Sequence, residues 1–185
     1  MNLKIHTLIT IFRLGFSNIL RILKYRFDKI NPYSRLRRIS ATTINGKFFE
    51  YTENSKTKNL NYNIDWDNKI CLFQFHKYNV DNLPEWNKNY INNICFADKD
   101  LDWWDIPDFD NNIGDIKTIW ELSRFHWCVA LAQQTIDGKH EALNQLNIWL
   151  EDWSNNNKPY KGINWKCGQE CSFRVINLIL SSLIL

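Results

Sequence analysis

The helical half of this chain opens with Asp115-Ile-Lys-Thr-Ile-Trp-Glu-Leu-Ser-Arg-Phe-His-Trp127. Asp115 follows a glycine and is a favoured helix N-cap. Four bulky side chains then recur at steps of four, three and four, namely Trp120, Arg124, Trp127 and Leu131. This spacing predicts one amphipathic helix from Asp115 to about Ile136, with Glu121 and Arg124 close enough to pair.

Two more helices are predicted after it. The second runs from about His140 to Trp153, and its core stripe is Leu143, Leu146, Leu150 and Trp153. The third follows a loop at 154–162. Its expected N-cap is Asn164, and Glu170 and Arg174 lie on it in the i,i+4 order that favours an ion pair. Antiparallel helices joined by short loops predict a mainly α fold of stacked helical hairpins over residues 115–185.

Residues 1–38 form a basic segment, with nine Lys and Arg against the single acid Asp28. Apolar side chains recur at three- and four-residue steps through residues 3–27, which predicts an amphipathic helix. Charges interrupt the apolar run too often for a signal peptide or a membrane span. The helix either docks on the rest of the protein or lies on an anionic membrane surface. No nucleic-acid-binding module surrounds the basic residues, so no nucleic-acid partner is expected.

The middle of the chain, residues 39–114, is expected to be an irregular, aromatic-rich connection. Asn45-Gly46 is a turn signal for a short hairpin. The apolar run at 70–75 fits a short strand or a buried turn of helix, and the His76 after it is expected to be structural. Residues 98–114 combine acids, proline and glycine with Trp103 and Trp104, which indicates a loop tied down by aromatic side chains.

The cysteines give no sign of a disulfide framework or a metal site. There are five of them, Cys71, Cys95, Cys128, Cys167 and Cys171, with no Cys-x-x-Cys spacing. An odd number without a framework spacing predicts reduced, buried thiols. Cys167 and Cys171 share a helix face, but no histidine is near them in sequence, so two small core residues are favoured over metal ligands. No metal and no cofactor are expected.

Seven polar and aromatic residues are candidates for binding a substrate: Trp120, Glu121, Arg124, Asn164, Trp165, Glu170 and Arg174. A planar guanidinium can donate two parallel hydrogen bonds to a carboxylate or a sulfate. An indole ring offers a flat apolar face to a sugar ring. The combination suits an acidic saccharide, although arginine and glutamate under tryptophan also occur simply to orient helices.

Residues 115–127 and the later Gly162-Ile-Asn-Trp-Lys-Cys-Gly-Gln-Glu-Cys-Ser-Phe-Arg174 resemble the heparinase II/III-like polysaccharide lyases. The resemblance is specific from about residue 115 to 178 and weaker from residue 64 to 79. It implies an incomplete α/α toroid followed by a β-sandwich, and cleavage of uronic-acid polysaccharide by β-elimination. Such a site neutralises the uronate carboxylate and supplies a base and an acid. It implies that the seven candidates line or brace the saccharide cleft.

The sequence departs from the family pattern in its catalytic residues. Family members commonly use an Asn-His pair and a tyrosine, and this chain contains no Asn-His dipeptide. Tyr160 precedes Asn164 in a loop and is not assigned that role. The β-sandwich is absent, and the chain ends in an apolar run without a helix stop signal. We therefore expect the N-terminal fragment of such a lyase, comprising the first helices of the toroid and inactive alone.

A non-catalytic protein is the alternative, namely a carbohydrate-binding or membrane-peripheral interaction module with its basic helix on the membrane. The sequence leaves the location open. The lack of a signal peptide and the odd cysteine count favour the cytoplasm, whereas the chemistry of the family favours the periplasm or the cell surface.

Overall fold

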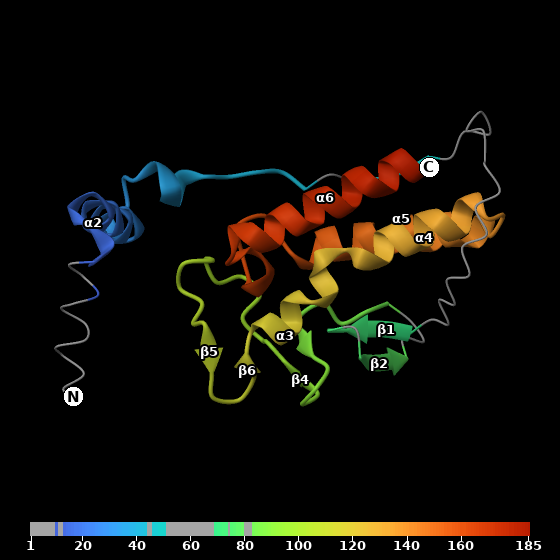
Figure 1. Ribbon diagram of the computed structural model, residues 1–185, viewed down its shortest axis with the longest axis horizontal. Coiled ribbons are helices and arrows are strands. Elements are labelled where there is room, and N and C mark those ends of the chain that lie inside the picture. Colours follow the sequence, from blue (N-terminus) through green and yellow to red (C-terminus); the bar gives the residue numbers. More distant parts are fainter. Residues whose placement is uncertain (1–9, 11–12, 44–45, 51–68, 74, 80–82) are drawn as a thin grey trace. The chain divides into compact units, whose positions relative to one another are not determined.

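The structure, a computed structural model, describes residues 10, 13–43, 46–50, 69–73, 75–79 and 83–185. The fold is mainly helical, as the sequence predicts, and its strands form only small two-stranded sheets. The chain divides into two compact units, residues 1–40 and 41–185 (Figure 1). The first unit is the basic segment, and the second holds all seven candidate site residues.

In the first unit, helix α2 spans Phe16–Ile30 and the 3-10 helix η1 spans Arg35–Arg38. The amphipathic helix predicted over residues 3–27 is interrupted at Gly15, which is the N-cap residue of α2, and α2 ends three residues beyond Phe27. Residues 3–9 and 11–12 of that prediction lie outside the described part of the chain. The Arg37 guanidinium donates to the carbonyl oxygen of Ile30 at 3.1 Å, which links η1 to the end of α2. None of the α2 side chains is buried. Among the described residues, no helix is long and apolar enough to cross a bilayer.

The core of the second unit lies around three helices, α4 (His126–Ile136), α5 (His140–Asn156) and α6 (Gly168–Ile184). Helix α4 packs on both α5 and α6, and Figure 1 shows the three running alongside one another. The predicted stripe on α5 is confirmed, because Leu146, Leu150 and Trp153 are buried and Leu143 packs against them. Indole rings fill the space between the helices: Trp86, Trp127, Trp149 and Trp153 all belong to this cluster.

The continuous helix predicted from Asp115 to Ile136 is wrong. The segment instead forms α3 (Lys117–Trp120), η2 (Leu122–Arg124) and α4. The break lies at Phe125, which has φ 67° in the left-handed region. Its buried ring meets Trp153 edge to face at 4.9 Å between centroids. Aromatic packing in the core compensates for a backbone conformation that costs about 1–3 kcal/mol in a non-glycine residue.

The predicted helix start at Asn164 is also wrong. Asn164 lies in a separate 3-10 turn, η3 (Ile163–Trp165), and α6 begins at Gly168 after the N-cap residue Cys167. The side chain of Asn164 is fully buried, so it is directed inward and does not cap a helix. The predicted N-cap at Asp115 is wrong as well, because the N-cap residue of α3 is Ile116. Asp115 Oδ1 instead accepts the backbone N–H of Lys117 at 3.0 Å, two residues along the chain.

The segment before α3 carries three antiparallel hairpins. They pair β1 (Lys69–Leu72) with β2 (His76–Asn79), β3 (Lys88–Asn89) with β4 (Ile94–Cys95), and β5 (Phe109–Asp110) with β6 (Gly114–Asp115). The run at 70–75 is thus strand only in its first part. The turn predicted at Asn45-Gly46 includes residues outside the described part of the chain. The loop at 98–114 is held to the α5–α6 connection by backbone, because the main-chain N–H of Trp103 donates to the carbonyl oxygen of Tyr160 at 3.3 Å.

Candidate functional site

Arg124 lies at the centre of three charged side chains, which we call the Arg124 cluster: Glu121, Arg124 and Glu170. Arg124 Nε donates to Glu170 Oε2 at 2.7 Å, and Nη2 donates to Glu170 Oε1 at 2.9 Å. Arg124 Nη1 donates to Glu121 Oε2, as the three-residue spacing predicts. The hydrogen bonds to Glu170 raise the pKa of Arg124 above its ordinary value. The cluster therefore ties η2 to the first turn of α6 by a bidentate ion pair.

The predicted pair of Glu170 with Arg174 does not form. Glu170 uses its carboxylate on Arg124, and Arg174 donates instead to two neutral acceptors. Its Nη2 lies 2.9 Å from the Asn164 carbonyl oxygen and 3.0 Å from Cys171 Sγ. The carboxylate of Glu170 is instead taken up by Arg124, which is 46 residues away in sequence and donates to both of its oxygens.

Arg174 is a buried cation among aromatic rings. Its guanidinium carbon lies 5.0 Å from the ring centre of Trp153 and 5.2 Å from that of Trp165. The residue is only 5% exposed, and Nη1 has no hydrogen-bond partner. Burial lowers the pKa of Arg174 below its ordinary value, although a guanidinium remains protonated at neutral pH. Cation–π contacts stabilise this charge, but one donor remains unused.

Asn164 joins three segments of the chain from inside the protein. Its Nδ2 donates to the carbonyl oxygen of Trp86 at 3.1 Å and to Asn157 Oδ1 at 2.8 Å. Its backbone carbonyl oxygen accepts a hydrogen bond from Arg174. Asn164 Oδ1 is buried without a partner. Since the residue is fully buried, it positions the loop before α6.

The indole N–H groups of the two predicted tryptophans also form hydrogen bonds within the protein. Trp120 Nε1 donates to the Ile163 carbonyl oxygen at 2.8 Å, and Trp165 Nε1 donates to that of Asn157 at 2.9 Å. Trp120 is buried, whereas Trp165 is half-buried and stacks obliquely on Tyr160. These bonds fix η3 against α3 and against the end of α5.

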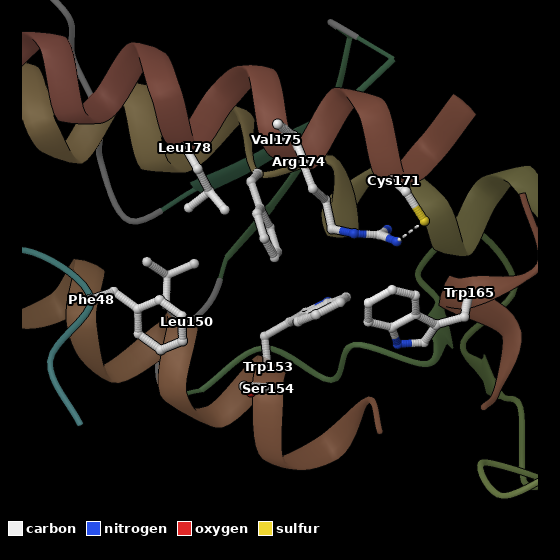
Figure 2. A pocket seen from close by; sticks show the side chains of 10 residues that line it. Phe48, Leu150, Trp153, Ser154, Trp165, Cys171, Arg174, Val175 and Leu178 are labelled. Atoms are coloured by element: carbon white, nitrogen blue, oxygen red, sulfur yellow. Dashed lines mark hydrogen bonds between the residues drawn. The ribbon is translucent and has the colours of Figure 1, made fainter. Parts of the chain in front are cut away.

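Ten residues surround a cavity of about 190 Å³ between α5 and α6, which we call the Arg174 cavity: Phe48, Phe125, Leu150, Trp153, Ser154, Trp165, Cys171, Arg174, Val175 and Leu178. Figure 2 shows Phe48, Leu150 and Leu178 toward one end and Trp165 and Cys171 toward the other. The Arg174 side chain extends from α6 over the Trp153 ring. The cavity is apolar, with a single charged group.

The structure thus brings the seven predicted residues together in two neighbouring groups. Glu121, Arg124 and Glu170 form the Arg124 cluster. Asn164 and Trp165 lie in η3, and Trp120 and Arg174 donate hydrogen bonds to its backbone. Sequence reasoning missed Asn157 and Phe125, which act through tertiary contacts that leave no local spacing signal. Trp153 was predicted to be a core residue. Its helical spacing did not reveal that the face of its ring also makes a cation–π contact with Arg174.

In the part of the chain that the structure describes, no three His, Cys, Asp or Glu side chains gather to hold a metal ion. All five cysteines are free thiols. Cys128 is buried, and burial raises the pKa of its thiol well above the ordinary value. Cys71 and Cys95 are exposed, which corrects the prediction of buried thiols.

No protein-family model, curated protein or solved structure matches this chain.

Proposed function

We propose that residues 115–185 are the first helices of a heparinase II/III-like polysaccharide lyase domain and bind an acidic, uronic-acid polysaccharide at the Arg124 cluster. One observation carries the proposal. The two separate segments that resemble the family, residues 115–127 and 162–174, meet through the bidentate bond between Arg124 and Glu170. Residues that are distant in sequence are therefore held together as a binding site requires.

The Arg124 cluster retains donors and acceptors for a saccharide. A guanidinium has five N–H donors. Arg124 uses one each on Nε, Nη1 and Nη2, so two N–H groups remain, and its side chain is 20% exposed. Two glutamates hold the guanidinium in place, which reduces the entropy cost of binding a carboxylate or a pair of hydroxyls.

Cleavage is not expected from this chain alone. Removing the proton next to a uronate carboxylate requires a base, and the glycosidic oxygen requires an acid. The sequence lacks the Asn-His dipeptide that the resemblance implies for this step. Both glutamates of the Arg124 cluster are engaged in ion pairs, so neither is a free base. We therefore propose binding without β-elimination.

Calorimetric titration with a uronic-acid oligosaccharide tests the binding, with a neutral oligosaccharide of equal length as the control ligand. Binding of the acidic oligosaccharide alone supports the proposal. Glu121→Gln should strengthen it, because this change removes a negative charge beside Arg124 that repels an acidic ligand. Glu141→Gln, on an exposed position of α5, is the matched control and should leave binding unchanged. Ultraviolet absorbance of unsaturated uronate, if it appeared with the pure chain, would overturn the non-catalytic part of the proposal.

A second candidate function, attachment to an anionic membrane surface, is favoured by α2. Its large apolar side chains are exposed at helical spacing, namely Phe16, Leu20, Leu23, Phe27 and Ile30. Basic residues surround them, including Arg21, Lys24 and Lys29. An amphipathic helix with this pattern lies in the lipid interface, with its basic side chains at anionic headgroups.

Co-sedimentation with vesicles tests this second candidate. The chain should sediment with vesicles rich in phosphatidylserine and not with pure phosphatidylcholine, and salt should weaken the binding. Leu23→Glu places a charge on the apolar face and should abolish it. Ile148→Glu, the same change of an exposed apolar side chain to glutamate outside α2, is the control. Equal sedimentation of the wild type and the Leu23→Glu variant would exclude a role for α2.

A further inference from the structure

The Arg174 cavity has an apolar wall although an arginine borders it. Seven of its ten lining residues are apolar or aromatic, and polar atoms contribute almost nothing to the wall. We propose that this cavity binds a small uncharged aromatic group, held by the rings and aliphatic side chains around it. No residue of the Arg124 cluster lines the cavity, so this site does not depend on saccharide binding.

The guanidinium of Arg174 leaves little for a polar ligand to bind. Its Nη2 already donates to the Asn164 carbonyl oxygen at 2.9 Å and to Cys171 Sγ at 3.0 Å. Its Nη1 has almost no accessible surface, so a group in the cavity does not reach it. A charged or hydroxylated ligand would lose its hydrogen bonds to water on entry and gain almost none in return. The ligand that fits is therefore uncharged and apolar.

The volume of the cavity and its aromatic lining determine the size and type of the ligand. An apolar cavity of about 150 Å³ stays dry and binds benzene. The Arg174 cavity, at about 190 Å³, therefore has room for a benzene ring with small substituents. Phe48, Phe125, Trp153 and Trp165 all line it. Aromatic pairs gain more than the area that they bury, so these rings favour an aromatic ligand over an aliphatic one of equal size.

The cavity reaches the protein surface at its rim. Val175 lines the cavity and is 54% exposed, and Ser154 on the facing helix is half-buried. Figure 2 shows Val175 on α6 above the space and Ser154 on α5 below it. A ligand can enter at this rim without unfolding either helix.

Calorimetric titration of the whole chain with p-xylene tests the proposal. Hydroquinone, kept reduced, is the control ligand, because it has the same shape with a hydroxyl in place of each methyl. Either orientation of hydroquinone places a hydroxyl against the apolar wall. We expect p-xylene to bind saturably and at least about tenfold more tightly than hydroquinone, since one buried polar group would be left unpaired. Equal affinity for the two ligands, or no saturable binding of p-xylene, would overturn the proposal.

Two variants locate the binding. Leu178→Phe adds bulk inside the cavity, and Val175→Phe adds bulk at the exposed rim, so the second remains informative if the first fails to fold. Each should weaken p-xylene binding by at least about tenfold, because the added ring takes the space of the ligand. The matched control is Ile176→Phe, which is exposed on α6 and not part of the cavity lining, and it should bind like the wild type. Binding of p-xylene that survives Val175→Phe unchanged would contradict the assignment to this cavity.

Discussion

Arg124 and Glu170 are 46 residues apart in sequence and share two hydrogen bonds, Nε to Oε2 at 2.7 Å and Nη2 to Oε1 at 2.9 Å. The Glu170 side chain is only 4% exposed. A buried carboxylate in this position depends on its partner, since an unpaired charge in the interior is far more costly than the intact pair.

Arg124→Met should therefore destabilise the protein strongly. We expect the free energy of unfolding to fall by about 3–5 kcal/mol, because Glu170 would remain buried without a cation. Urea denaturation measures this. The double variant Arg124→Met with Glu170→Met should be more stable than Arg124→Met alone, since Glu121 is then the single carboxylate of the cluster left without its cation. A stability of Arg124→Met within about 0.5 kcal/mol of the wild type would contradict the role of the pair.

Gly162 should not tolerate alanine. Its φ is +73°, and a Cβ would lie 2.9 Å from the carbonyl oxygen of Lys99. Gly138 is the control, because its φ is +91° and no atom lies within 4 Å of an added Cβ. Alanine at position 138 would therefore meet the same backbone strain as alanine at position 162, but no steric clash. Gly138→Ala should cost about 1 kcal/mol, and Gly162→Ala clearly more. Equal midpoints of thermal unfolding for the two variants would show that the contact with Lys99 is unimportant.

Asn147 should hold Phe48 and Phe49 against α5. Its Oδ1 accepts the Phe48 and Phe49 N–H groups at 2.8 and 2.9 Å, and its Nδ2 donates to the Phe49 carbonyl at 2.9 Å. Asn147→Leu would leave these backbone groups without partners. We expect the free energy of unfolding to fall by about 1–3 kcal/mol as a result. Amide exchange at Phe48 and Phe49 should accelerate in this variant. The control is Asn144→Leu, at an exposed position on α5. In this variant the amide exchange rates of Phe48 and Phe49 should equal those of the wild type.

Cys128 should make stability depend on alkaline pH. Burial raises the pKa of its thiol well above the ordinary value of 9.0. The unfolded thiol releases its proton as pH rises past that value, whereas the folded thiol keeps it. The contribution to stability is therefore complete below about pH 9 and declines above it, by up to about 1.4 kcal/mol per pH unit. Cys128→Ala should remove this part of the decline in the free energy of unfolding. If the free energy of unfolding fell equally steeply with pH in the wild type and in Cys128→Ala, a contribution from this thiol would be excluded.

Thiol labelling gives a second test of the same burial. Cys71 and Cys95 are exposed and should react with a maleimide in the native protein, whereas Cys128 should react only in denaturant. Mass spectrometry of peptides identifies the modified residues. Rapid native labelling of Cys128 would contradict its position in the core.

Local patterns in the sequence predicted the elements whose formation depends on local rules. Helix α5 and its buried stripe follow from apolar spacing alone. The pair of Glu121 with Arg124 follows from their separation on one turn. These features require only neighbours within four residues, which a spacing rule describes.

Three of the failed predictions involve partners that are distant in sequence. Phe125 interrupts a helical pattern because its ring packs against Trp153. Asn164 is turned inward by Trp86 and Asn157, so it cannot cap α6. Glu170 forms its ion pair with Arg124 on η2 and not with its i,i+4 neighbour Arg174. No local rule ranks these contacts, since tertiary packing overrides propensity and spacing.

The most direct test of the account is calorimetric titration of a uronic-acid oligosaccharide into the wild-type chain and into Glu121→Gln. Our proposal predicts saturable binding of the acidic oligosaccharide to the wild type and no binding of the neutral one. It also predicts about fivefold tighter binding of the acidic oligosaccharide to Glu121→Gln, because the variant removes a repulsion of about 1 kcal/mol beside Arg124. No binding of the acidic oligosaccharide to the folded wild type, or equal binding of the neutral one, would contradict an acidic-saccharide site at the Arg124 cluster.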